Sequence, residues 1–189
     1  ISGKNIMSRY LEANLDFVRI LSDVERDSAI SVPALIESRR VQLLQETCDL
    51  TFLHYFHRPI GSVSDGEIPN GSKFRVLSIE LQESIGRGEI WFNNLEVLEY
   101  LEDPRGVEVG TDIHRDGGFG GYTNYICIFK LEGKGQFLVY ENLNGDNPKE
   151  LDSSPGNLII MKPDVCHAFT RVKPPAYSFA LRQKLKLIH

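Results

Sequence analysis

The chain has 189 residues, 41% hydrophobic and 25% charged, which indicates a globular domain able to bury a core without disulfide bonds. No apolar run reaches the roughly 18 residues of a membrane span and no signal-peptide pattern opens the sequence, so we expect no membrane partner. The net charge is −5, and because residues 162–189 are net basic, the rest is strongly acidic. An acidic body argues against a nucleic-acid partner bound through broad phosphate contacts.

The first third of the chain reads as mostly helical. Apolar residues recur at helical spacing over 34–52, which predicts a helix there. Residues 57–73 collect Gly, Pro, Ser and Asn, and we interpret them as a long loop that acts as a lid. We expect one domain over 1–189, in which 1–73 form a mostly helical support with the lid loop and 74–189 form a β-barrel core.

From residue 74 onward the pattern changes to short apolar runs separated by Gly, Pro and Asn. Such runs predict strands, and many short strands with turn residues between them favour a sandwich or barrel. The expected fold is therefore mainly β with flanking helices. The predicted strands are 74–81, 95–101, 123–131, 135–141, 156–162, 167–172 and 176–182.

The cysteines are odd in number and widely spaced, at Cys48, Cys127 and Cys166. This usage predicts free thiols in a reducing compartment, and hence a cytoplasmic protein.

A histidine and a carboxylate lie two positions apart at His114 and Asp116. If this segment is a strand, both side chains point to the same face and can reach one metal ion. His167 is the best-placed third ligand, since it follows a strand and a turn and begins another apolar strand. Two imidazoles and one carboxylate with open coordination positions are typical of iron(II) oxygenases.

The order of these motifs resembles the iron(II)/2-oxoglutarate-dependent dioxygenase superfamily over roughly 97–184. The matching motifs are HRD at 114–116, PGNLIIMKPDVCH at 155–167 and AYSFALRQ at 176–183. The resemblance implies a double-stranded β-helix, a jelly-roll or cupin-like barrel, in which His114, Asp116 and His167 hold Fe(II). It also implies that 2-oxoglutarate and O₂ are used to hydroxylate or desaturate a C–H bond of a small-molecule or amino-acid-like substrate.

The chain departs from the family at the residue that anchors the cosubstrate. Members usually place Arg, or sometimes Lys, two residues before a Ser or Thr on the last strand, where it pairs with the far carboxylate of 2-oxoglutarate. Here Ser178 fits, but Ala176 occupies the Arg position. By strand alternation Arg182 shares the face of Ser178, and Arg171 shares the face of His167. Both are candidate anchors, and the sequence leaves open which one acts, or whether the cosubstrate is 2-oxoglutarate.

Two further residues take roles from the resemblance. Tyr100 is similar to a tyrosine that several members use to touch the cosubstrate. Asp116 separates the chain from the family's halogenases, which replace the ligand carboxylate with a small residue.

Two alternatives stay open at this point. One is a cupin-like metal-binding barrel that does not use 2-oxoglutarate, such as another dioxygenase, an isomerase or a ligand sensor. The other is a nucleic-acid demethylase of the same superfamily. The sequence has no HxH pair and no basic stripe, which favours the small-molecule oxygenase. Substrate identity and oligomeric state are not encoded in a readable motif.

Overall fold

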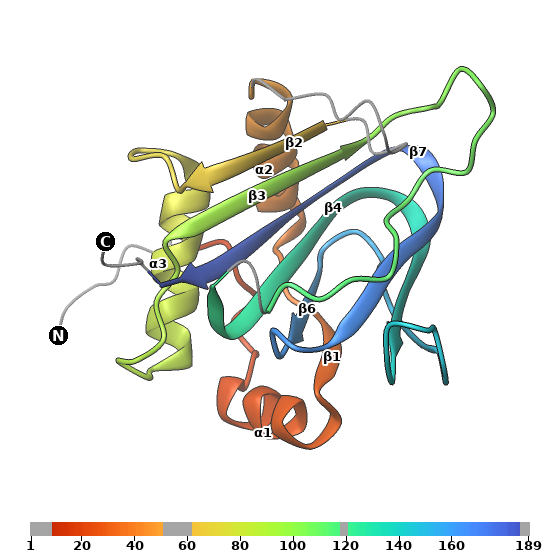
Figure 1. The fold of residues 1–189 in the computed structure, drawn as a ribbon. Coiled ribbons are helices and arrows are strands. Elements are labelled where there is room, and N and C mark those ends of the chain that lie inside the picture. Colours follow the sequence, from red (N-terminus) through yellow and green to blue (C-terminus); the bar gives the residue numbers. More distant parts are fainter. Residues whose placement is uncertain (1–8, 51–61, 118–120, 186–189) are drawn as a thin grey trace, which may run out of the picture.

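The computed structural model describes residues 9–50, 62–117 and 121–185 (Figure 1). Three helices and seven strands are present in these ranges. In chain order they are α1 (Phe17–Asp27), β1 (Ala29–Pro33), α2 (Glu37–Cys48), β2 (Ser62–Glu67), α3 (Lys73–Ile85), β3 (Asn94–Tyr100), β4 (Tyr122–Tyr140), β5 (Lys149–Leu151), β6 (Asn157–Met161) and β7 (Cys166–Lys184).

The strands form one antiparallel sheet that curls back on itself. Its order is β1-β6-β4-β7-β3-β2, and β5 pairs with the far half of β4. β4 and β7 are each 19 residues long and pair from Tyr122–Lys184 to Tyr140–Cys166. Register shifts between Lys130 and Gln136 bend the paired strands at their middle. Residues 136–140 of β4 and 166–170 of β7 therefore fold over the other half of the pair (Figure 1). The expected mainly β, double-stranded β-helix architecture is confirmed.

Two apolar clusters lie on the two faces of this sheet. The outer cluster joins α1 and α3 to side chains such as Phe129 and Phe179 on β4 and β7. The inner cluster lies between the two layers of the curled sheet and includes Tyr100, Phe169 and Ala176. The helices therefore pack on the outer face of the sheet, and side chains from its two layers meet on the inner face.

The prediction of a strand over 74–81 was wrong, because these residues form the first part of α3. The Ser72 side chain caps the helix by accepting a hydrogen bond from the Arg75 amide at 3.1 Å. Gly86 ends it in the left-handed conformation, with φ 66°. Both capping residues are visible in the sequence, but the dense apolar run between them favoured the prediction of a strand.

The buried residues of α3 recur at helical spacing. Phe74, Leu77 and Leu81 are fully buried, whereas Val76 and Ile79 are exposed at 41% and 47%. A strand would have placed Phe74 and Val76 on one face. The exposed pair adds to the dense apolar run from which a strand was predicted.

Other segments also differ from the expectation. Residues 62–67 of the predicted lid loop form β2, which pairs with β3, and 57–61 lie outside the described residues. The predicted helix over 34–52 begins at Glu37 and ends at Cys48. The predicted strands 123–131 and 135–141 are two halves of β4, and 167–172 and 176–182 belong to β7. Across the described ranges, no helix has the length and apolar character needed to cross a membrane.

The helical assignment of α3 predicts a specific pattern of destabilisation. Phe74→Ala should lower the free energy of unfolding by about 3–5 kcal/mol and Leu77→Ala by about 2–5 kcal/mol, because each leaves a cavity in the outer cluster. Val76→Ala should change it by less than about 0.5 kcal/mol. Urea unfolding followed by circular dichroism measures all three, and a loss at Val76 equal to that at Leu77 would contradict the helix.

Candidate metal centre

Backbone pairing brings the two candidate histidines side by side. The segment before Asp116 runs antiparallel to the first half of β7, with isolated bridges at Val109–Val172 and His114–His167. The His114 amide donates to the His167 carbonyl at 3.0 Å, and the His167 amide donates back at 2.9 Å. The two imidazole centroids consequently lie 4.2 Å apart.

Asp116 joins this pair from a bend rather than from a strand. The expectation that His114 and Asp116 occupy one regular strand was wrong, because His114 forms a single bridge and the chain then turns. The Gly117 amide donates to the Pro163 carbonyl at 2.6 Å, and a Cβ at Gly117 would lie 2.8 Å from that oxygen. Glycine therefore lets the chain approach Pro163 closely enough to turn Asp116 toward the histidines.

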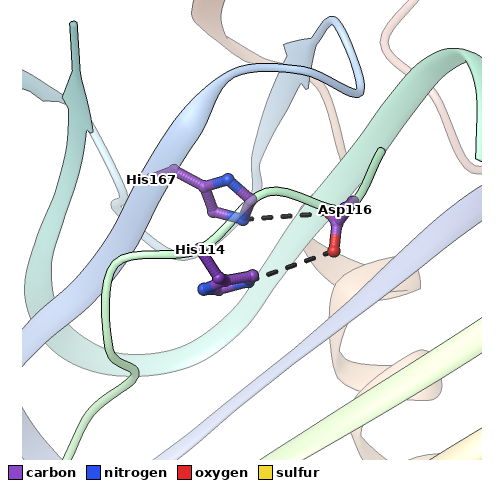
Figure 2. A group of neighbouring side chains, drawn as sticks. All are labelled: His114, Asp116 and His167. Atoms are coloured by element: carbon purple, nitrogen blue, oxygen red, sulfur yellow. Dashed lines mark ion pairs between the residues drawn. The ribbon is translucent and has the colours of Figure 1, made fainter. Parts of the chain in front are cut away.

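The three side chains converge on one point (Figure 2). Asp116 Oδ1 lies 4.0 Å from His114 Nε2, and Asp116 Oδ2 lies 3.8 Å from His167 Nε2. All ligand atoms lie within 4.8 Å of one another. Nitrogen and oxygen ligands bind a metal at about 2.0–2.2 Å, so small rotations bring all three within reach of one ion. The side chains of His167 and Asp116 are 4% and 12% exposed, and that of His114 is 38% exposed.

Both imidazoles are held in the form that a metal requires. His114 Nδ1 lies 2.8 Å from the Asp112 carbonyl, and His167 Nδ1 lies 3.0 Å from the Val165 carbonyl. A proton on Nδ1 satisfies each carbonyl and leaves the Nε2 lone pair directed at the shared point. Burial, followed by the nearby His114, lowers the pKa of His167 to about 4, so this ring is neutral at pH 7. Two imidazole nitrogens and one carboxylate are a donor set that fits a divalent iron ion.

Arg182, near the C-terminal end of β7, lies close to the Asp116 carboxylate. Its Nη1 lies 2.9 Å from Glu96 Oε2 and 3.7 Å from Asp116 Oδ1. Its Nε donates to Asn94 Oδ1 at 2.9 Å, and its guanidinium lies over the Tyr122 ring at 4.2 Å. The sequence placed Arg182 on the inner face, and it is buried there. In this position it orients Asp116, and its contact with cosubstrate stays a prediction.

Tyr100 and Ser178 lie deeper between the layers. Both are buried, and a hydrogen bond joins their hydroxyls. Burial raises the pKa of the Tyr100 phenol, so the hydroxyl stays protonated. Ala176 pairs with Tyr100 across β3 and β7 and shares the face of Ser178. The small side chain at 176 therefore places no charge on this part of the inner face.

Arg171 does not share the face of His167, contrary to the sequence-based expectation. The alternation along β7 breaks at Arg171, whose φ is 50°, and its side chain is exposed. Its amide donates to Glu108 Oε1 at 3.0 Å. Arg171 is thus an exposed residue at the bend of β7, outside the inner cluster that surrounds His167.

Lys130 is the residue that sequence reasoning missed. It is 1% exposed, and among the described residues no acceptor makes a hydrogen bond with its Nζ. The ammonium lies 3.7 Å from the Phe169 ring centroid and 5.7 Å from that of Tyr100. Burying a charge costs several kcal/mol, and a desolvated cation–π contact returns about 2 kcal/mol, so the rings do not offset the cost. Burial accordingly lowers the pKa of Lys130 to about 7.

A sequence signal for Lys130 did exist. It is the only charged residue in the apolar run 123–131, and it lies two and four positions after Ile128 and Ile126. Those isoleucines belong to or pack against the inner cluster, so alternation places Lys130 on the inner face.

Alanine substitution of each candidate ligand residue tests whether the three side chains bind iron. His114→Ala, Asp116→Ala or His167→Ala should weaken iron(II) binding by more than about 100-fold, because even outer partners of metal ligands contribute 10–100-fold. Asp164→Ala is the matched control, since Asp164 is an exposed carboxylate near His167 in the sequence. Iron content after anaerobic loading and gel filtration measures the effect, and full iron occupancy in the Asp116 and His167 variants would contradict the triad.

The buried ammonium predicts an unusual dependence of stability on pH. The pKa of Lys130 is about 7 in the folded protein, well below the ordinary lysine value of 10.5 that applies when the chain is unfolded. Between these values the unfolded chain binds more protons, so the contribution of Lys130 to stability rises with pH and levels off above the unfolded pKa. Lys130→Met should therefore stabilise the protein most near pH 7, on the order of a few kcal/mol, and progressively less toward higher pH. Chemical unfolding at several pH values tests this, and a constant or growing difference would contradict it.

Comparison with known proteins supports the fold rather than a particular activity. No protein-family model and no curated protein sequence matches the chain. Among solved structures, a prolyl-4-hydroxylase from Pseudomonas putida is similar with a TM-score of 0.69 and 11% identity, covering 90% of this chain and 100% of that one. A 2OG-Fe(II) oxygenase family oxidoreductase from Burkholderia pseudomallei gives a TM-score of 0.66 and 11% identity, covering 89% and 90%.

A third similar structure is the α-ketoglutarate-dependent epimerase SnoN from nogalamycin biosynthesis. Its TM-score is 0.68 at 15% identity, covering 89% of this chain and 82% of that one. The chain therefore has the double-stranded β-helix fold of solved 2-oxoglutarate–iron(II) oxygenases, with His114, Asp116 and His167 gathered between its two layers.

Proposed function

We propose that this protein is an iron(II)- and 2-oxoglutarate-dependent oxygenase that hydroxylates a C–H bond of a small-molecule or amino-acid-like substrate. The observation that carries the proposal is the convergence of two Nε2 atoms and one carboxylate inside this fold, each imidazole oriented through its Nδ1 (Figure 2). Bound iron would supply activation of O₂, with 2-oxoglutarate as the source of electrons. His114, Asp116 and His167 would hold the iron and leave its remaining positions open.

The surroundings of His167 favour chemistry protected from water. The Phe137 ring stacks on the His167 imidazole with centroids 5.5 Å apart, and Phe169 packs edge-on against Tyr100 at 5.3 Å. These rings belong to or border the inner cluster. A dry lining strengthens electrostatic contacts and limits side reactions of the bound cosubstrate.

Asp116 favours hydroxylation over halogenation. A ligand carboxylate fills the coordination position that a halide would need, and Arg182 holds that carboxylate at 3.7 Å. The substrate radical would therefore collect a hydroxyl group. Desaturation would require a second hydrogen to be removed, and epimerisation, the activity named for SnoN, would require a hydrogen donor on the opposite face of the substrate. Hydroxylation requires neither, and for that reason we place it first.

The proposed substrate class rests on the charge of the chain. The chain has 26 acidic against 21 basic residues, which does not favour a polyanion. A prolyl-4-hydroxylase and an epimerase from an antibiotic pathway share this fold, so it accommodates substrates that differ widely beyond the reacting carbon.

Isotope labelling tests the reaction type. With iron(II), 2-oxoglutarate and ¹⁸O₂, a panel of amino acids and small metabolites should yield a product one oxygen heavier, with one ¹⁸O atom in the succinate formed beside it. Mass spectrometry measures both. His167→Ala should give neither, and Asp164→Ala should behave as wild type. Substrate oxidation without succinate would contradict 2-oxoglutarate dependence, and a chlorinated product in high chloride would contradict the role of Asp116.

A further inference from the structure

The inner face of the barrel carries two buried cations that differ in one respect. Arg182 lies against two carboxylates, those of Glu96 and Asp116. Lys130 is equally buried, but its Nζ lies against aromatic rings, those of Phe169 and Tyr100. Within the described ranges its Nζ makes no hydrogen bond. A buried amine without a hydrogen-bond partner is costly and needs a physical explanation, and a ligand anion would supply one.

Strand register places Lys130 beside two hydroxyls. Lys130 pairs with Ser178 across β4 and β7, so the two side chains share the inner face. Tyr100 pairs with Ala176, two residues before Ser178 on β7, and its hydroxyl interacts with the Ser178 side chain. An ammonium and two hydroxyls on one otherwise apolar face are the donors that a carboxylate requires.

Phe169 links this group to the metal centre. It lies two positions after His167 on β7, a step of about 6.6 Å along a strand. Its ring rests over Gly135, where a Cβ would lie 2.5 Å from the ring, and under the Lys130 ammonium. Phe169 therefore places the Lys130 ammonium one alternate strand position from His167, on the inner face toward which a short diacid chelated at the metal would extend its other end.

The residue at 176 gives an independent reason to look to Lys130. An arginine two residues before Ser178 would project onto the same inner face, but Ala176 ends at its Cβ, packed against Gly133. The positive charge on this part of the inner face therefore comes from the neighbouring strand β4.

We propose that Lys130, assisted by Tyr100 and Ser178, binds the distal carboxylate of the 2-oxo diacid that chelates the iron. The inference rests on the proposed function, because it assumes that a 2-oxo acid binds at the triad. It assigns to β4 the anchoring role that Ala176 cannot fill, and it makes Arg182 a positioning residue for Asp116.

The test compares two acids that differ only at the distal carboxylate. Iron(II)-loaded protein is titrated without oxygen with 2-oxoglutarate and, separately, with 2-oxopentanoate, and the weak visible charge-transfer band of the chelate reports binding of each. Wild type should bind 2-oxoglutarate at least about 30-fold more tightly than 2-oxopentanoate, the loss expected when one partner of a buried charged pair is removed. Lys130→Met should lose this preference while binding 2-oxopentanoate within about twofold of wild type.

Matched variants separate anchoring from a structural role. Lys134→Met is the control, since Lys134 lies on the same strand outside the inner cluster and should leave both affinities unchanged. Lys130→Arg should retain part of the preference, because it restores the positive charge. Lys130→Met is expected to fold, since methionine fits apolar surroundings without a charge.

The outcomes distinguish this inference from the proposed function. If both acids give the band but wild type binds them equally, or if Lys130→Met keeps the full preference for 2-oxoglutarate, Lys130 is not the anchor and the iron site stands. If neither acid gives the band with iron-loaded wild type, the proposed function fails, and the anchoring role fails with it.

Discussion

The antiparallel pairing of β4 with β7, bent at its middle, is the constraint on which the site depends. Arg182 and His167 lie far apart on β7, and a straight strand would separate them by about 50 Å. In the folded chain Arg182 Nη1 lies 3.7 Å and His167 Nε2 3.8 Å from the Asp116 carboxylate. Gly133 permits this bend, because its φ is 86° and a Cβ there would lie 2.3 Å from that of Ala176. The bend therefore turns two ends of one strand into neighbours.

The sequence predicted the parts of this arrangement that depend on residue type and order. The ligand set His114, Asp116 and His167 could be named because few donor combinations fit a redox metal with open positions, and the structure brings the three together. The barrel followed from turn residues between short apolar runs. Helix α3 was missed because the exposed apolar residues Val76 and Ile79 make the segment as densely apolar as a short strand.

Features that depend on bends could not be predicted by alternation. Arg171 was assigned to the inner face by counting in twos from His167, and a single residue with positive φ reversed that result. Lys130 was not predicted as buried from its position in an apolar run. Lysine is common in such runs, because its long side chain can extend the charge to water. Only the three-dimensional packing shows that here the charge stays between Phe169 and Tyr100.

The balance of charge on the inner face explains why one cation is held tightly and the other is not. Arg182 is fixed by Asn94 and Glu96 before any ligand arrives, so Asp116 meets an organised partner. Lys130 has no such partner among the described residues, and its burial lowers the stability of the ligand-free fold. An anion that binds beside Lys130 removes this cost, so part of its affinity comes from relieving an unfavourable feature of the empty barrel. Selection for folding alone would replace Lys130 with an apolar residue of similar volume, and a ligand that needs the charge gives a physical reason to keep it.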